Sequence, residues 1–101
     1  MAIIAVDYDD VLHNPDAQKP GMRMGLPVEG AIEAMQGMKI KGHELIVFTV
    51  RGDRPKHVID WLRYYNIPFD DVTRIKPDAS LFIDDKALTF RGWEKLESPW
   101  R

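Results

Sequence analysis

Hydrophobic residues along this chain gather in short continuous runs that polar residues end abruptly. Three runs stand out, at 2–6, 45–48 and 81–83. Each is shorter than a typical helix and apolar at every position, which is typical of central strands covered on both faces. A weaker run at 72–75 predicts one further short strand.

Helical spacing occupies the intervals between these runs. From 28 to about 41 the apolar residues recur with helical periodicity, and Gly42 follows as a glycine suited to end a helix. Asp53 is predicted to cap a second helix, with Pro55 in its first turn and its end near Asn66. The alternation of strands and helices predicts an α/β fold.

The length of 101 residues limits the chain to one domain, because a second core would leave about 50 residues for each. The segment at 13–27 has little periodicity and contains three prolines and two glycines. Loops of this length in compact domains are usually functional or disordered. Since Met22, Met24 and Leu26 occupy alternate positions, the segment also fits a small hairpin flap. We refer to residues 13–27 as the flap.

Composition excludes several classes of protein. With no Cys, the chain has no disulfide, no thiol nucleophile and no cysteine-zinc site. No apolar run approaches the roughly 20 residues that span a bilayer, and the N-terminus lacks the basic region of a signal peptide. We therefore expect a cytoplasmic protein without a membrane partner. The net charge of −2 and the absence of a basic stripe with interleaved aromatic residues do not favour a nucleic-acid partner.

Polar side chains follow each strong run: Asp7, Asp9 and Asp10 after the first, Thr49 after the second, and Asp84 and Asp85 after the third. Ligands of open parallel sheets bind outside the carboxyl ends of the strands. A single acid would be explained by a cap or a turn, whereas five acids at two strand ends favour a site. Two carboxylates about 4 Å apart repel by roughly 4 kcal/mol at an effective dielectric near 20, so such a cluster needs a cation or raised pKa values to persist. Oxygen ligands with no His or Cys beside them indicate Mg²⁺ rather than zinc.

The residues at these strand ends resemble the motifs of the haloacid dehalogenase superfamily. Residues 3–12, IIAVDYDDVL, resemble its first motif, a hydrophobic strand followed by Asp-x-Asp-x-(Thr/Val)-(Leu/Val). Residues 45–49 look like its second motif, Lys76 fits the lysine of the third, and residues 81–85 fit the paired acids of the fourth. The four motifs occur in order, and the resemblance implies a three-layer Rossmann-like fold with a central parallel sheet.

The resemblance also implies a phosphoryl-transfer mechanism. Asp7 would be the nucleophile that forms an aspartyl-phosphate, and Asp9 would be the general acid and then the general base. Thr49 would hydrogen-bond the phosphoryl oxygens, while Lys76 would neutralise their charge. The expected cofactor is Mg²⁺, with the ligands Asp7, Asp9 through its backbone carbonyl, Asp84 and Asp85. An acid at the position of Asp9 favours hydrolysis of phosphoesters over dehalogenation.

Several nearby residues have weaker claims. Arg51 is a candidate contact for the substrate phosphate, with a solvated surface position as the equal alternative. Asp10 is interpreted as a turn or capping residue, and Lys86 is the competitor of Lys76 for neutralising the phosphate. The three histidines (His13, His43 and His57) lack metal-ligand spacing and are interpreted as surface or packing residues.

The spacing of the motifs leaves no room for a cap domain of the kind that superfamily members often carry. An open site admits a phosphorylated macromolecule, while a small phosphorylated metabolite remains an alternative if the flap or a homo-oligomer covers the site. The predicted function is therefore that of a Mg²⁺-dependent, cap-less phosphatase. The alternatives are a phosphate- and metal-binding or signalling module without turnover, and a phosphotransferase to an acceptor other than water.

Overall fold

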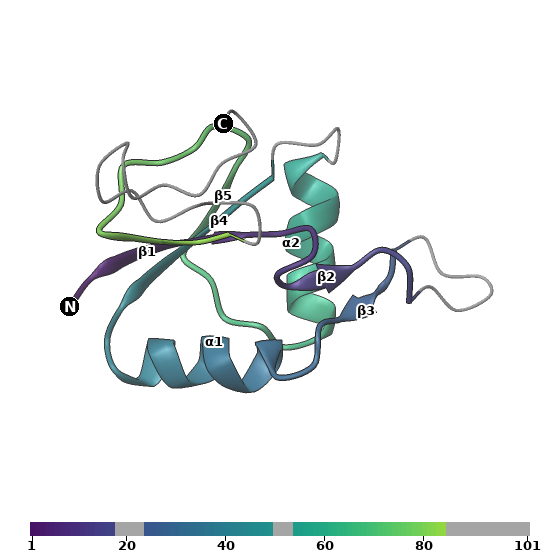
Figure 1. Cartoon of the computed structure of the whole chain (residues 1–101), viewed down its shortest axis with the longest axis horizontal. Coiled ribbons are helices and arrows are strands. Elements are labelled where there is room, and N and C mark those ends of the chain that lie inside the picture. The colour runs from purple at the N-terminus through teal and green to yellow at the C-terminus, as the bar shows by residue number, and fades with distance from the viewer. Residues whose placement is uncertain (18–23, 50–53, 85–101) are drawn as a thin grey trace, which may run out of the picture.

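A parallel sheet forms the centre of the protein (Figure 1). The computed structural model describes residues 1–17, 24–49 and 54–84. Within them, four parallel strands lie in the order β5-β4-β1-β6. The strands are β1 (Ile3–Asp7), β4 (Glu44–Phe48), β5 (Asp71–Thr73) and β6 (Leu81–Ile83). Each predicted apolar run therefore contributes a strand, and the α/β class with a parallel sheet is confirmed.

Helix α1 (Ala31–Ile40) connects β1 to β4, and it begins three residues later than its apolar periodicity predicts. The cause is Gly30, whose φ of 83° lies in the left-handed region that a right-handed helix does not contain. Gly42 ends the helix as predicted, with a φ of 86°. The N–H groups of Gly42 and His43 then satisfy the last carbonyl groups, those of Lys39 at 3.0 Å and Met38 at 3.2 Å.

Helix α2 (Pro55–Tyr64) connects β4 to β5 and begins with the predicted proline. Its N-cap is Arg54, so the predicted cap at Asp53 is wrong by one position. A residue that precedes proline is restricted to extended conformations, and an N-cap has this conformation. Asn66 ends the helix with a φ of 56°, and its N–H group donates to the carbonyl of Arg63 at 3.2 Å.

The core lies between one face of the sheet and both helices. Ile4 and Val6 of β1 lie opposite Leu45 and Val47 of β4, so these four side chains share a face. They belong to a buried cluster that includes residues of α1 (Ala31, Met35) and of α2 (Val58, Trp61, Leu62). Both crossovers run in the same direction across the sheet, and right-handed connections then put both helices on one side. The three-layer arrangement stays a prediction.

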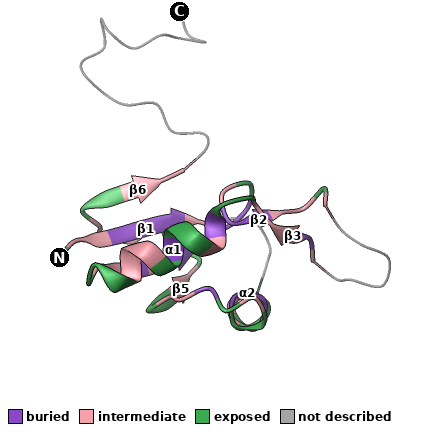
Figure 2. Ribbon diagram, turned by 90° about the horizontal axis from the view of Figure 1, so that it is seen from below, coloured by how far each residue is buried: buried purple, intermediate pink, exposed green. Residues whose placement is uncertain are grey.

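A short antiparallel pair of strands lies at the base of the flap. Strand β2 (His13–Asn14) pairs with β3 (Leu26–Pro27), with His13 opposite Pro27. This pairing agrees with the predicted hairpin, although residues 18–23 lie outside the described part. Figure 2 shows the buried centre of β1, with more exposed residues in β6 and β5. In the described ranges, no helix is long and apolar enough to cross a membrane.

Candidate functional site

The register of the sheet brings three of the predicted site residues to one edge. Asp7 lies opposite Phe48, so Thr49 is the next residue along the neighbouring strand. Val6 lies opposite Ile83 on the other side, so Asp7 and Asp84 follow at the same level. Because all these strands are parallel, Asp7, Thr49 and Asp84 meet at the carboxyl edge of the sheet, as expected for a ligand site in an α/β fold.

Thr49 is almost completely buried at this edge. Its exposed fraction is 1%, and its backbone N–H donates to the carbonyl oxygen of Thr73 at 3.0 Å. Its side-chain Oγ1 is also buried, and it has no hydrogen-bond partner among the described residues. A buried hydroxyl left unpaired costs about 1–3 kcal/mol, so this oxygen is available to a ligand at the strand end.

A tight turn carries the chain from β1 into the flap and positions Asp9. The carbonyl oxygen of Tyr8 accepts hydrogen bonds from the N–H groups of Leu12 at 3.0 Å and His13 at 2.9 Å. The N–H of Asp10 donates to the carbonyl of His13 at 2.8 Å, and Asp10 itself has a φ of 67°. Asp10 therefore occupies the turn, as predicted, and the turn brings the side chains of Asp9 and His13 together.

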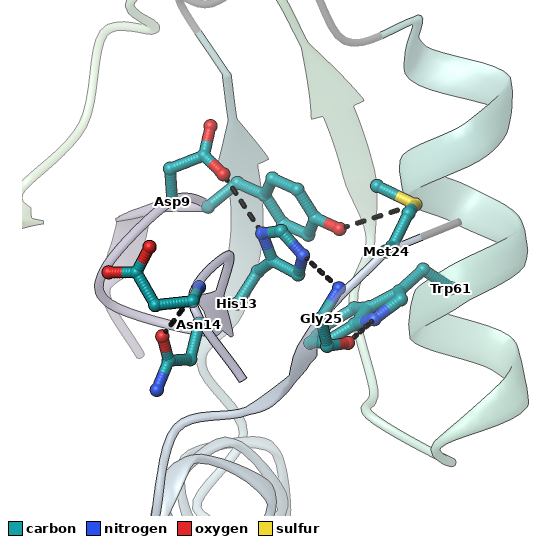
Figure 3. Close-up of polar contacts among 8 residues, drawn as sticks. Asp9, His13, Asn14, Met24, Gly25 and Trp61 are labelled. Atoms are coloured by element: carbon teal, nitrogen blue, oxygen red, sulfur yellow. Dashed lines mark hydrogen bonds and ion pairs between the residues drawn. The ribbon is translucent and has the colours of Figure 1, made fainter. Parts of the chain in front are cut away.

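Asp9 and His13 form a buried hydrogen-bonded pair (Figure 3). The Nδ1 atom of His13 lies 2.9 Å from Oδ1 of Asp9, and the exposed fractions of the two residues are 6% and 9%. The other ring nitrogen, Nε2, lies 2.7 Å from the backbone nitrogen of Gly25. A backbone N–H can only donate, so Nε2 accepts and the ring proton is assigned to Nδ1. His13 is therefore neutral in this network and donates to Asp9.

Aromatic side chains surround the imidazole of His13. The ring of Tyr8 is stacked on it, with centroids 4.8 Å apart and an interplanar angle of 1°. Trp61 of α2 meets the ring edge-on at 5.4 Å, and its indole N–H donates to the carbonyl oxygen of Gly25 at 2.9 Å. Gly25 is thus held on both sides, by His13 and by Trp61 (Figure 3).

Lys76 lies against an aromatic ring of the sheet. Its Nζ atom is 4.5 Å from the ring centroid of Phe82 in β6, a cation–π arrangement. Phe82 in turn contacts Phe48 of β4, with centroids 6.2 Å apart. The lysine is therefore placed beside β6, the strand that leads to Asp84, and its predicted role toward a phosphate stays a prediction.

The predicted Mg²⁺ ligands are described only in part, since Asp85 lies outside the described residues. The same is true of Arg51 and Lys86. Among the residues that the structure describes, no group of three or more His, Cys, Asp or Glu side chains could hold a metal ion. The ligands that remain, carboxylates of Asp7 and Asp84 and the backbone carbonyl of Asp9, are the oxygen type that Mg²⁺ prefers. Binding of Mg²⁺ at this edge stays a prediction.

His13 is the residue that the sequence-based interpretation undervalued. A packing role is confirmed by its burial and by its stacking on Tyr8, but its hydrogen bond to Asp9 was not expected. The sequence does place a histidine four residues after the candidate general acid, and the segment between them is too short to keep the two side chains far apart.

Comparison with known proteins bears on the fold. A conserved protein from Bacteroides thetaiotaomicron has a similar solved structure, with a TM-score of 0.66 and 26% sequence identity. The similarity covers 86% of this chain and 78% of that protein, whose description gives no activity. No family model and no curated protein matches the chain.

Proposed function

We propose that this protein is a Mg²⁺-dependent phosphatase of the haloacid dehalogenase type, which hydrolyses a phosphomonoester through an aspartyl-phosphate on Asp7. The observation that carries the proposal is the buried Oγ1 of Thr49 at the carboxyl edge of the sheet, which has no hydrogen-bond partner among the residues that the structure describes. A phosphoryl oxygen is an acceptor that this hydroxyl can reach once substrate occupies the edge between β1 and β4. The order and spacing of the four motifs support the same chemistry.

The proposed reaction has two steps. A carboxylate oxygen of Asp7 attacks phosphorus while the bond from phosphorus to the leaving oxygen breaks, and Asp9 gives its proton to that oxygen. Asp9 then takes a proton from water, and the water oxygen attacks phosphorus and releases Asp7 with inorganic phosphate. Thr49 donates to a phosphoryl oxygen in both steps. Bound Mg²⁺ would offset the repulsion between the anionic carboxylate and the anionic phosphate.

The burial of Asp9 suits its place in this mechanism. The carboxyl group has one oxygen, Oδ1, engaged with His13, which leaves the other oxygen for the proton that is exchanged with substrate or water. Asp7 and Asp84 are more exposed than Asp9, as residues that meet substrate and metal at an open edge should be.

The experiment is hydrolysis of p-nitrophenyl phosphate by the full chain, with Mg²⁺ or with EDTA. We expect activity with Mg²⁺, its loss with EDTA, and loss of at least a hundredfold in Asp7→Asn, in line with the roughly 10²-fold or larger effects of removing a catalytic group. Asp60→Asn, which removes an exposed carboxylate on α2, is the matched control and should retain activity.

Three outcomes would contradict the proposal. Full activity in Asp7→Asn would show that Asp7 is not the nucleophile. A wild type that binds inorganic phosphate and Mg²⁺ yet is inert across a broad panel of phosphomonoesters would indicate a binding module. Formation of a phosphorylated alcohol in place of free phosphate, in the presence of an alcohol acceptor, would indicate a phosphotransferase.

A further inference from the structure

We propose that His13 is a positioning residue, which holds the carboxyl group of Asp9 for proton transfer and connects it to the base of the flap. The inference rests on the proposed phosphatase function, because it assigns a role toward the general acid of that reaction. It adds a residue that none of the four motifs contains.

The hydrogen bonds of His13 determine which ring nitrogen carries the proton. The N–H of Gly25 donates to Nε2 of His13 at 2.7 Å, so the ring proton is on Nδ1 and is donated to Oδ1 of Asp9 at 2.9 Å. Both ring nitrogens are therefore used, and each has a different partner. Buried polar atoms are normally paired, and the partner of Nδ1 is here the carboxyl group of the proposed general acid.

Neighbouring aromatic side chains hold this arrangement rigid. The stacked ring of Tyr8 and the edge of Trp61 fix the plane of the imidazole. Gly25 is fixed in turn by the indole of Trp61, through the 2.9 Å bond to its carbonyl oxygen. Because the histidine cannot tilt, the Oδ1 atom of Asp9 is held in one place, and the second carboxyl oxygen keeps one orientation.

The fixed orientation of the Asp9 carboxyl group has a consequence for proton transfer. A general acid is effective only when its proton lies within hydrogen-bond reach of the leaving oxygen. His13 occupies one oxygen of Asp9 as a donor, so the exchangeable proton is confined to the other oxygen. The network also connects the acid to the base of the flap, since Gly25, immediately before β3, supplies the bond that selects the tautomer of His13.

The substitution series separates the two ring nitrogens. The side-chain amide of Asn can place a donor near the position of Nδ1, whereas the longer side chain of Gln places its amide near the position of Nε2. We therefore expect His13→Asn to keep most of the positioning of Asp9, and His13→Gln and His13→Ala to lose it.

The test compares two substrates that differ in their need for an acid. Phenyl phosphate releases phenolate, which is as basic as a tyrosine side chain with a pKa of about 10, whereas p-nitrophenolate is a far weaker base that leaves without much assistance. In His13→Ala we expect kcat/KM for phenyl phosphate to fall at least tenfold more than kcat/KM for p-nitrophenyl phosphate, because kcat/KM reports the step in which the leaving oxygen is expelled. A purely structural role would lower both rates equally, and that result would overturn the proposal.

The controls distinguish this inference from the function on which it rests. An active wild type with equal losses in His13→Ala overturns only the positioning role, while an inert wild type overturns the phosphatase function and the role together. If His13→Ala does not fold by circular dichroism, the comparison of His13→Asn with His13→Gln decides. Nitrogen NMR of the wild-type imidazole gives a readout without turnover. We expect a protonated Nδ1 and an unprotonated Nε2, and the opposite tautomer would overturn the proposal.

Discussion

The backbone N–H of Thr49 is bonded to the carbonyl oxygen of Thr73 at 3.0 Å, while the hydroxyl of the same residue has no partner in the described part of the chain. The main chain of Thr49 thus continues the sheet from β4 toward β5, while its hydroxyl group is buried without a hydrogen bond to the described residues. Such a hydroxyl opposes stability, which separates its contribution to folding from its contribution to binding.

Thr49→Val should therefore stabilise the protein and inactivate it. Valine has nearly the shape of threonine and removes the unpaired hydroxyl, so we expect unfolding in urea to become harder by about 1 kcal/mol. Hydrolysis of p-nitrophenyl phosphate should fall at least tenfold. Thr49→Ser, which keeps the hydroxyl, is the control and should keep more activity with lower stability. A destabilised Thr49→Val would show that the hydroxyl has a partner within the folded protein.

Gly25→Ala should destabilise the base of the flap. A Cβ atom at this position would lie 1.8 Å from the carbonyl oxygen of Asn14, which belongs to the facing strand and cannot move independently. We expect a loss of about 3 kcal/mol, typical of strong overpacking. Gly37→Ala in α1 is the matched control, because nothing lies within 4 Å of its Cβ, and it should gain about 0.5–1 kcal/mol from helix propensity. Equal effects in urea unfolding would contradict this packing.

Substitutions of Asp10 test the backbone strain of the turn that follows β1. Its φ of 67° lies in the left-handed region, which costs residues with a Cβ about 1–2 kcal/mol. Asp10→Ala and Asp10→Gly remove the same carboxylate, so the difference between them isolates the backbone term. Thermal unfolding should show Asp10→Gly to be more stable than Asp10→Ala by about 1 kcal/mol. The reverse order would show that the turn does not depend on this φ.

The carboxylate of Asp70 makes the stability of the protein depend on pH in the acidic range. Its pKa is lowered by the hydrogen bonds from the Lys39 ammonium, at 2.6 Å to each oxygen, and from the N–H of Leu45 at 2.7 Å. Its contribution is therefore complete above the ordinary pKa of 3.8 and is lost as pH falls below that value through the lowered folded-state pKa. Because the Asp70 side chain is 32% exposed, solvent screening keeps the contribution under about 1 kcal/mol.

The measurement for Asp70 is urea unfolding between pH 2 and pH 6, about two units on each side of an ordinary carboxyl pKa. Asp70→Asn should lose stability mainly at the upper end of this range, so that its profile is flatter than that of the wild type. Asp60→Asn, which removes an exposed carboxylate on α2, is the control substitution. A parallel shift of the Asp70→Asn profile at every pH would show that its charge is not responsible.

The sheet could be predicted from the sequence because each strand is a continuous apolar run. Residues 81–83 have the predicted bounds, and the end of α1 at Gly42 follows from a conformation that glycine adopts easily. The start of α1 was missed because the helical spacing of apolar residues already begins at Val28, whereas the left-handed Gly30 prevents the helix from starting before Ala31. Periodicity reports which face is buried, not the backbone angle of one residue.

The candidate site could be predicted only as a set of strand ends. Parallel register brings Asp7, Thr49 and Asp84 to one edge, and this follows from the strands alone. The pairing of Asp9 with His13 depends on the turn at 8–13 and on Gly25, which is distant in sequence. Such contacts arise from loop geometry, and no hydrophobic pattern records loop geometry.

The central position of β1 in the sheet has a consequence for folding during synthesis on the ribosome. Ile4 pairs with Leu45 on one side and Leu81 on the other, 41 and 77 positions further on (45 − 4 and 81 − 4). At about 5–20 residues per second, the second side of this apolar strand waits about 4–15 seconds for its partner to be made. The nascent chain therefore carries an open, aggregation-prone strand until residue 81 has been made, and a chaperone that shields extended apolar segments would meet it there first.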